Sequence, residues 1–472
     1  MLSAPLCQTG SVSRLHRIIT WATLWLLLAA PVRAETWKTV ASDRGVTFTV
    51  RLHHPHVVRK VPLVDGARWD IAVTNSVRNH VSKVLPSGPI ASVTIDQKAR
   101  YVRIVARWRF PYAIAPKVQD DRFSFLIPYE ITRSAVTDLA TGLRFVRLHR
   151  WTPAGPVFIN AVYADLRRFS LRPELATRRR GFSTEPVSSI ARRVKAWAAV
   201  NGSFFSPRGG APIGLLMLDG QIVSSSFFNR SVFGVRYDGS CFINNARLHA
   251  ALRVGDSQTF LANAVNRPTA HNQLILYTPH WGDRTRSVPD PSRREFAIAE
   301  DGTILSICTG NSVIPKDGFV ASAQGRAVAE MLQHVHVGSR VIVYSQLSNE
   351  WEGVKYAIGG GPTLVDQGQV KVTARQERFG AEIARGRAPR TAIGYLGGTQ
   401  AVLVAVDGRQ KHSIGMTLYE LARTMRELGS REAINLDGGG STAMVVRGRL
   451  VNHPSDGVER AVNNAVVLVG GG

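Results

Sequence analysis

The alternation of hydrophobic and polar residues divides the chain into two regions. Before about residue 150, segments 46–52 and 101–108 alternate strongly, which is typical of half-buried antiparallel strands. No helical period of comparable quality occurs in this region. We therefore predict a β-rich accessory domain over residues 35–150.

Residues 151–472 show a mixed pattern. Segments 188–200 and 417–429 have a helical period, and Thr417 and Glu420 form a capping box at the start of the second. Several apolar runs turn at Asp-Gly or Gly-Gly pairs, which indicates hairpins. We predict an α+β fold with a mixed or antiparallel sheet, few helices and glycine-rich loops at one rim.

A glycine loop, a strand and a tight turn recur three times in this second region. The three copies span residues 209–223, 359–370 and 438–450. This repetition suggests that several glycine loops meet at the rim of a shared sheet. The alternative is that such short strings recur by chance.

The N-terminal segment has the features of a secretory leader. Basic residues precede an apolar run over 18–30, and Val32-Arg33-Ala34 offers small residues for cleavage. We predict a signal peptide over residues 1–34 and a location outside the cytoplasm, in the periplasm, the cell envelope or the medium. A retained N-terminal anchor is the alternative, although the run is shorter than the ~20 residues of a spanning helix.

The chain is strongly basic, with 59 Lys and Arg against 34 Asp and Glu and a formal charge of +25. This charge favours an acidic or phosphate-containing glycan as partner, although an arginine-rich solvated surface would also produce it. Export and the absence of nucleic-acid-binding motifs argue against nucleic acid. We expect membrane contact at most through an uncleaved leader.

Cysteines and histidines give weak signals. Cys241 and Cys308 could pair in an oxidising compartment, and no CxxC motif is present. Two histidine groups lack a carboxylate or cysteine at ligand spacing, so we predict no metal site and no cofactor, with a divalent ion left open. These groups are His53, His54 and His56, and His334 and His336.

The strongest chemical signal is the run from Asp437 to Thr442. Common phosphate-loop, zinc-protease and dinucleotide motifs are absent, and Gly439–Ala443 fails the GxSxG pattern. Three successive glycines let backbone N–H groups converge on an anionic oxygen. Asp437 would place a carboxylate on the rim, and the alternative is a plain glycine turn in which it accepts local N–H groups.

Six strings between residues 201 and 460 together resemble the phosphodiester glycosidase family. The resemblance implies hydrolysis of a sugar C1–O bond to phosphate, and a mixed fold in which the strings converge. Residues 35–150 and much of 240–350 lie outside it. The matching strings are Asn201-Gly-Ser-Phe-Phe205, Gly359-Gly-Gly-Pro362, Pro389-Arg-Thr-Ala-Ile-Gly394, Val406-Asp-Gly-Arg409, Asn435 to Thr442, and Glu459-Arg460.

These strings supply the candidate site residues. Asp437 and either Asp407 or Glu459 would form the carboxylate pair usual in glycoside hydrolysis. Arg390, Arg409 and Arg460 would clamp a phosphate. Asn435 could bind sugar or tie two loops together. The other candidate substrate-binding residues are Asn201, Gly360, Gly361, Thr391, Gly438, Gly439, Gly440, Ser441 and Thr442.

We therefore predict an exported hydrolase of sugar-1-phosphodiesters in an envelope or extracellular glycan. Two alternatives stay open. One is a non-catalytic polysaccharide-binding or exopolysaccharide-assembly protein, and the other is an ordinary exo-glycosidase. The sugar, the aglycone and the stereochemical outcome are not specified by the sequence.

Overall fold

A computed structural model describes residues 37–470 of the chain except for short gaps, and the chain divides into two compact units. One unit contains the described residues up to 132 together with 151–155. The other contains residues 133–150 and those from 156 onward. The gaps are residues 43–44, 53–56, 64, 73–78, 85–89, 99, 110–113, 177–180, 227, 256–257 and 269.

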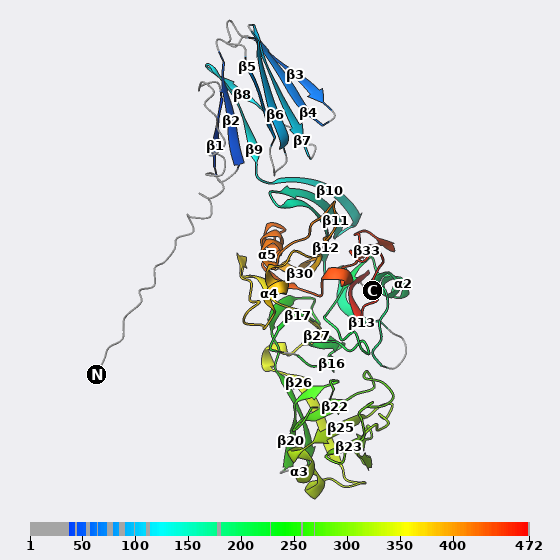
Figure 1. Ribbon diagram of the computed structural model, residues 1–472. Coiled ribbons are helices and arrows are strands. Elements are labelled where there is room, and N and C mark those ends of the chain that lie inside the picture. Colours follow the sequence, from blue (N-terminus) through cyan, green and yellow to red (C-terminus); the bar gives the residue numbers. More distant parts are fainter. Residues whose placement is uncertain are drawn as a thin grey trace, which may run out of the picture. The chain divides into compact units, whose positions relative to one another are not determined.

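The first unit consists of two antiparallel sheets, with strand orders β1-β2-β9-β8 and β3-β4-β7-β6-β5 (Figure 1). Their inner faces share one core, in which Trp69 and Phe125 stack with ring centroids 5.6 Å apart. The strands predicted over 46–52 and 101–108 are confirmed as β2 and β7. The bounds are β1 Trp37–Ala41, β2 Gly45–Arg51, β3 Val57–Leu63, β4 Gly66–Ala72, β5 Asn79–Val84, β6 Ile90–Lys98, β7 Tyr101–Trp108, β8 Lys117–Gln119 and β9 Arg122–Pro128.

The second unit is built on an eight-stranded sheet of order β10-β11-β12-β31-β30-β32-β28-β29. Strands β30 and β31 lie inside this sheet and are largely buried, and from Ala392 and Ala401 onward they carry small or hydrophobic residues instead of an alternating pattern. The bounds are β10 Ile131–Ala140, β11 Leu143–Thr152, β12 Gly155–Asp165, β28 Thr363–Asp366, β29 Gln369–Val370, β30 Arg390–Gly397, β31 Gln400–Val406 and β32 Glu432–Asn435.

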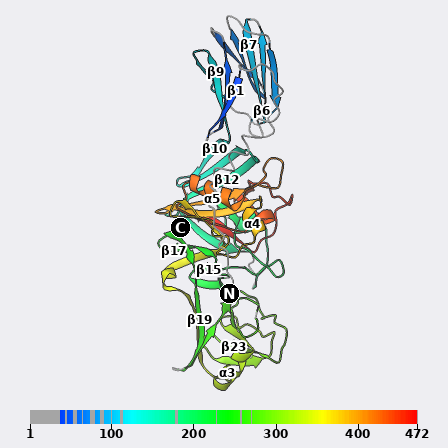
Figure 2. The same ribbon diagram turned by 60° about the vertical axis from the view of Figure 1, so that its left-hand side comes forward.

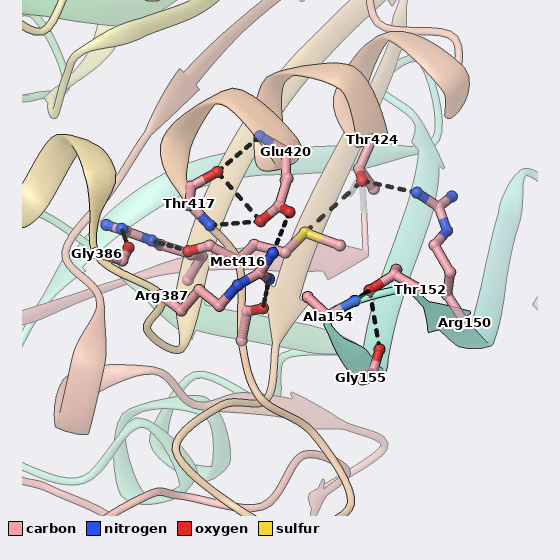
Figure 3. A network of polar contacts seen from close by, with 12 residues as sticks. Arg150, Thr152, Ala154, Gly155, Gly386, Arg387, Met416, Thr417, Glu420 and Thr424 are labelled. Atoms are coloured by element: carbon pink, nitrogen blue, oxygen red, sulfur yellow. Dashed lines mark hydrogen bonds and ion pairs between the residues drawn. The ribbon is translucent and has the colours of Figure 1, made fainter. Parts of the chain in front are cut away.

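Helix α5 (Leu418–Glu427) packs its apolar side on this sheet. Thr417 and Glu420 form the predicted capping box, and Glu420 also binds Arg387 (Figure 3). Gly429 follows the helix with φ +92°, a conformation that suits glycine at a helix C-terminus. Both predicted ends of this helix are therefore confirmed to within two residues.

The helix predicted over 188–200 is wrong in its second half. Helix α2 covers only Val187–Arg193, and strand β14 (Ala198–Asn201) follows it. All four residues of β14 are buried, and they pair with a strand on each side. Lys195 interrupts the helix with φ +54°. The apolar residues that suggested one helix over 188–200 therefore belong to a short helix and a buried strand.

Strand β14 belongs to a five-stranded sheet of order β13-β35-β14-β33-β34. A third sheet has the order β16-β15-β27-β17-β18. The three recurring glycine-strand-turn units lie in three different sheets, so the expectation of one shared sheet is wrong. The bounds are β13 Phe169–Leu175, β15 Leu216–Leu218, β16 Gln221–Ser224, β17 Ser231–Arg236, β18 Cys241–Asn245, β27 Val354–Gly359, β33 Met444–Val446, β34 Arg449–Leu450 and β35 Asn464–Gly470.

Residues between β18 and β27 form two smaller sheets, β20-β19-β26 and β21-β22-β25-β23-β24. Helix α3 and strand β23 lie side by side in Figures 1 and 2, and α3 packs into the same hydrophobic core. His334 ends this helix, and His336 follows it instead of lying on a strand. The bounds are β19 Leu248–Val254, β20 Gln258–Ala262, β21 Ala264–Val265, β22 Leu274–Tyr277, β23 Arg293–Ile298, β24 Ile304–Cys308, β25 Phe319–Gln324, β26 Val341–Leu347 and α3 Arg326–His334.

The predicted fold class is confirmed, because the described residues form mostly antiparallel sheets with four short helices. The hairpins expected at 238–239, 301–302 and 397–398 are present. Strands β10 and β11 belong mainly to the second unit, although the sequence assigned 133–150 to the first domain. The functional roles given to the two domains stay predictions.

The remaining features are the predicted leader, the membrane-spanning potential of the helices and the two cysteines. The predicted leader and His53, His54 and His56 lie outside the described residues. None of the described helices is long and apolar enough to cross a membrane. Cys241 is buried and Cys308 is exposed, and both are free thiols, so the proposed disulfide is absent. Burial raises the pKa of Cys241 to about 12, which makes it unreactive.

Candidate active site

The glycine loop begins where β32 ends and closes in a single 3₁₀ turn over Gly439–Ser441. Gly439 has φ +60°, so a side chain there would be strained. The backbone N–H of Asp437 donates to Gly202 at 3.1 Å, and that of Gly439 donates to Pro389 at 2.9 Å. The loop is therefore held by the segment after β14 and the segment before β30.

Asp437 places its carboxylate inside this turn. The backbone N–H of Gly438 donates to its Oδ1 at 2.9 Å. Burial raises the pKa of Asp437 to about 6, although the Ser441 hydroxyl, the Gly438 N–H and the Arg460 charge act in the opposite direction. A carboxyl group with this pKa exchanges its proton near neutral pH, which suits acid, base or nucleophile chemistry.

We expect this pKa shift to make Asp437 a cost to stability above pH 6. Between pH 4 and 6 the native state holds the proton that the unfolded state has already released, so the free energy of unfolding falls as pH rises. The Asp437→Asn variant lacks this loss. Urea unfolding measures this free energy at pH 4.5 and 7.5. The difference in free energy of unfolding, variant minus wild type, should be about 1 to 3 kcal/mol larger at pH 7.5 than at pH 4.5. The same stability difference between variant and wild type at both pH values would contradict the raised pKa of Asp437.

Three arginines adjoin the three glycines 438–440, one at each position. A methyl group on the first glycine would lie 3.9 Å from Cδ of Arg390, and one on the second 3.5 Å from two nitrogens of Arg409. A methyl group on the third would lie 2.1 Å from Nη2 of Arg460. The structure thus places part of each nominated arginine beside the glycine loop, and their use as a phosphate clamp stays a prediction.

Arg390 is the buried member of this group. Its Nε donates to the carbonyl of Met416 at 2.9 Å, and its Nη2 donates to the carbonyls of Ile383 and Gly386, each at 2.7 Å. Burial, and next the charge of Arg409, lower the pKa of Arg390 to about 10. Its hydrogen-bond acceptors are neutral, so a bound anion would stabilise its charge.

Arg409 and Arg460 are exposed on the other side of the loop. Arg460 pairs with Asp456 at 2.5 Å, and its Nη1 lies 3.5 Å from Oγ of Ser441. Arg409 has φ +59° and, among the described contacts, no hydrogen bond or ion pair. Non-glycine residues in this conformation are often found at functional sites. Sequence analysis missed Asp456, because residues 456–460 form a loop and only its folded course brings Asp456 to Arg460.

Asn201 positions the loop from β14. Its Nδ2 donates to the carbonyl of Asp437 at 2.6 Å, and its Oδ1 accepts from Thr391 Oγ1 at 2.6 Å and from Ala443 N at 3.2 Å. Thr391 also lies 3.4 Å from the hydroxyl of Thr442. These buried side chains use their polar atoms on the protein, so their predicted contact with substrate would be indirect.

We expect Asn201→Ala to destabilise the protein by about 2 to 4 kcal/mol, because it leaves several buried polar groups without partners. Urea unfolding measures this change. Asn349→Ala, at an exposed position, is the control and should change stability by less than about 0.5 kcal/mol. Equal stability of the two variants would show that the network does not hold the loop.

Asn435 ties two loops together, as the alternative interpretation proposed. Its Nδ2 donates to the carbonyls of Gly361 and Leu436 at 3.0 and 2.7 Å. Its Oδ1 is buried and has no hydrogen-bond partner in the described structure. A Cβ on Gly360 would lie 2.4 Å from the Asn435 carbonyl, and one on Gly361 2.2 Å from Glu377. These two glycines therefore allow the loops to approach closely.

The other two candidate catalytic carboxylates have partners elsewhere. Asp407 is fully buried and contacts His412 and His453. Glu459 accepts hydrogen bonds from the backbone N and hydroxyl of Ser188 at the start of α2, at 2.8 and 2.6 Å. Neither carboxylate contacts the glycine loop among the described hydrogen bonds, and their catalytic roles stay predictions.

Comparison with known proteins gives a match over part of the chain. Residues 292–469 match the family model described as phosphodiester glycosidase. Mouse N-acetylglucosamine-1-phosphodiester alpha-N-acetylglucosaminidase is 30% identical over 178 residues, which are 34% of this chain and 33% of that protein. Residues 292–469 are thus similar to this family, and the resemblance inferred from the motifs is confirmed at that level.

Two solved structures share the fold. A protein from Synechocystis has a TM-score of 0.65 at 20% identity, covering 95% of this chain and 84% of that one. A protein from Burkholderia pseudomallei K96243 has a TM-score of 0.59 at 20% identity, covering 92% and 100%. By contrast, the chain spans about a third of the length of the mouse relative.

Proposed function

We propose that this protein is a phosphodiester glycosidase that hydrolyses the bond between sugar C1 and a phosphate oxygen. One observation carries the proposal: Asp437, with its pKa raised to about 6, lies on a glycine loop that adjoins Arg390, Arg409 and Arg460. A phosphodiester supplies the anion for the arginines and a glycosidic carbon for the carboxylate. The family of residues 292–469 and the mouse relative's printed activity support this substrate class.

The arrangement assigns separate tasks to the arginines and the carboxylate. Arg390 and Arg409 would hold the phosphate oxygens, and Arg460 would lie beside the carboxylate. A phosphate is a good leaving group when its charge is stabilised, so little help from a general acid is needed. Asp437 in its ionised form would then attack the anomeric carbon or activate a water molecule. Asp456, which pairs with Arg460, is a second carboxylate beside Gly440 of the loop.

The leader-like segment and the basic composition extend the proposal to location and substrate. We propose that the protein is exported and acts on a phosphate-containing glycan of the envelope or the surroundings. The positive charge would attract such a polymer. The first unit, a two-sheet β structure, would then serve as an accessory domain for the same glycan.

The direct test is release of free sugar from a synthetic sugar-1-phosphodiester by the purified mature protein. The substrates should include phosphodiesters of several sugars and the aryl glycosides of the same sugars. Comparing the two sets separates this activity from that of an ordinary exo-glycosidase. Turnover of phosphodiesters alone supports the proposal. Binding of glycans without any turnover would instead support the polysaccharide-binding alternative and overturn the proposed reaction.

A further inference from the structure

Two histidines and one aspartate form a cluster close to Arg409 in the sequence and the structure. Asp407 follows β31, His412 is in the loop after it, and His453 is in the loop after β34. His453 Nδ1 lies 2.9 Å from Oδ2 of Asp407, and His412 Nε2 lies 3.3 Å from the same oxygen. One donor atom from each residue lies within 4.8 Å of the other two.

The protein fixes the orientation of this carboxylate. Oδ1 of Asp407 accepts the backbone N–H of His453 at 3.1 Å, while its main chain is bound by Phe158 and Ser413. Oδ2 therefore faces the two imidazoles. Among the described residues, these imidazoles are the only groups at ion-pair distance from Asp407, whose side chain has no exposed surface. A buried carboxylate requires a compensating cation.

We propose that Asp407, His412 and His453 bind a divalent transition-metal ion, with zinc as the best match. In a tetrahedral zinc site with bonds of about 2.0 to 2.1 Å, neighbouring ligand atoms lie about 3.3 Å apart. The two observed contacts of 2.9 and 3.3 Å are close to this spacing. Two imidazoles and one carboxylate leave a fourth position for water or substrate.

The donor set and its surroundings select the type of ion. Imidazole nitrogens favour zinc and its neighbours over magnesium and calcium, which prefer oxygen ligands. The side chain of His453 is 65% exposed, so an ion can enter from solvent. Metal-binding carboxylates are usually oriented by a hydrogen bond to the oxygen that does not bind the metal, and Oδ1 of Asp407 accepts such a bond from the backbone N–H of His453.

The proposed ion would also link two parts of the glycine-loop site. Asp407 lies two residues before Arg409, and His453 precedes Asp456 and Arg460 in one loop. A metal bound to both segments would fix the distance between the two exposed arginines. This inference does not depend on the reaction proposed above, because it concerns only ion binding by this chain.

Zinc titration of the full mature chain tests the proposal. After chelator treatment and dialysis at pH 7.5, isothermal titration with zinc chloride should give one saturable site, and elemental analysis should give one zinc per chain. His412→Ala and His453→Ala should each weaken binding at least tenfold. His249→Ala, at an exposed histidine on β19, should leave binding unchanged and serves as the control.

Two results would overturn the inference. One is the absence of saturable zinc binding to a wild-type protein whose circular dichroism is native. The other is binding that persists unchanged in the double variant His412→Ala, His453→Ala. In either case the histidines would act only as hydrogen-bond partners of Asp407.

Discussion

Replacing Asp437 with asparagine is expected to lower kcat for a sugar-1-phosphodiester by about a hundredfold to ten-thousandfold, the range for loss of a positioned acid–base or nucleophilic group. The amide is nearly the same size and can still accept the Gly438 N–H, so the loop should keep its shape. The substrate should bind with little change in KM, because the arginines are intact. Initial-rate measurements of sugar release give both constants.

The pH dependence of the wild type provides a second readout of the same residue. The proposed reaction uses the ionised carboxylate, so kcat/KM should rise as the pH passes through about 6, the pKa of Asp437. Asp366→Asn, a substitution at an exposed carboxylate at the end of β28, is the matched control and should keep the wild-type rate. Full activity of Asp437→Asn would refute the assignment of this residue.

Replacing Arg409 with asparagine is expected to lower kcat/KM for phosphodiesters by about a hundredfold or more, comparable with the loss of an oxyanion donor. Asparagine tolerates the left-handed backbone of this position, where φ is +59°, better than alanine does. The change therefore removes the guanidinium without adding backbone strain. Inhibition by inorganic phosphate should weaken in parallel, because both effects measure binding of the same anion.

Arg286→Asn is the matched control for this variant. Arg286 is also exposed and has φ +55°, but it lies in a different loop of the second unit. Its replacement should leave both catalysis and phosphate inhibition as in the wild type. If Arg409→Asn retained normal phosphate inhibition, the clamp would not include this arginine.

Local signals in the sequence predicted some elements well. The capping box and Gly429 delimit α5 because the residues that satisfy its ends are adjacent in the chain. The end of α2 could not be found in the same way, since the buried strand β14 continues an apolar pattern compatible with a helix. Its neighbours β33 and β35 lie far away in sequence, and only their pairing defines it as a strand.

The candidate site shows the same division. The glycines and arginines were found because they lie in recognisable short strings, and the structure does place them together. The sequence did not show which site residues are buried and hold the loop and which are exposed. That distinction depends on tertiary contacts such as the one between Asn201 and Thr391. His412 and His453 were missed since 40 residues lie between them, and only the meeting of two loops at Asp407 brings them together.

The position of β35 determines when the domain can finish folding. This strand follows all the other described strands in sequence, yet it lies between β13 and β14 and pairs with both. During synthesis, β13 and β14 are therefore complete more than 260 residues before the strand that joins them. The five-stranded sheet therefore stays incomplete on the nascent chain until β35 has been synthesised, and during that interval the edges of β13 and β14 are exposed to wrong pairing.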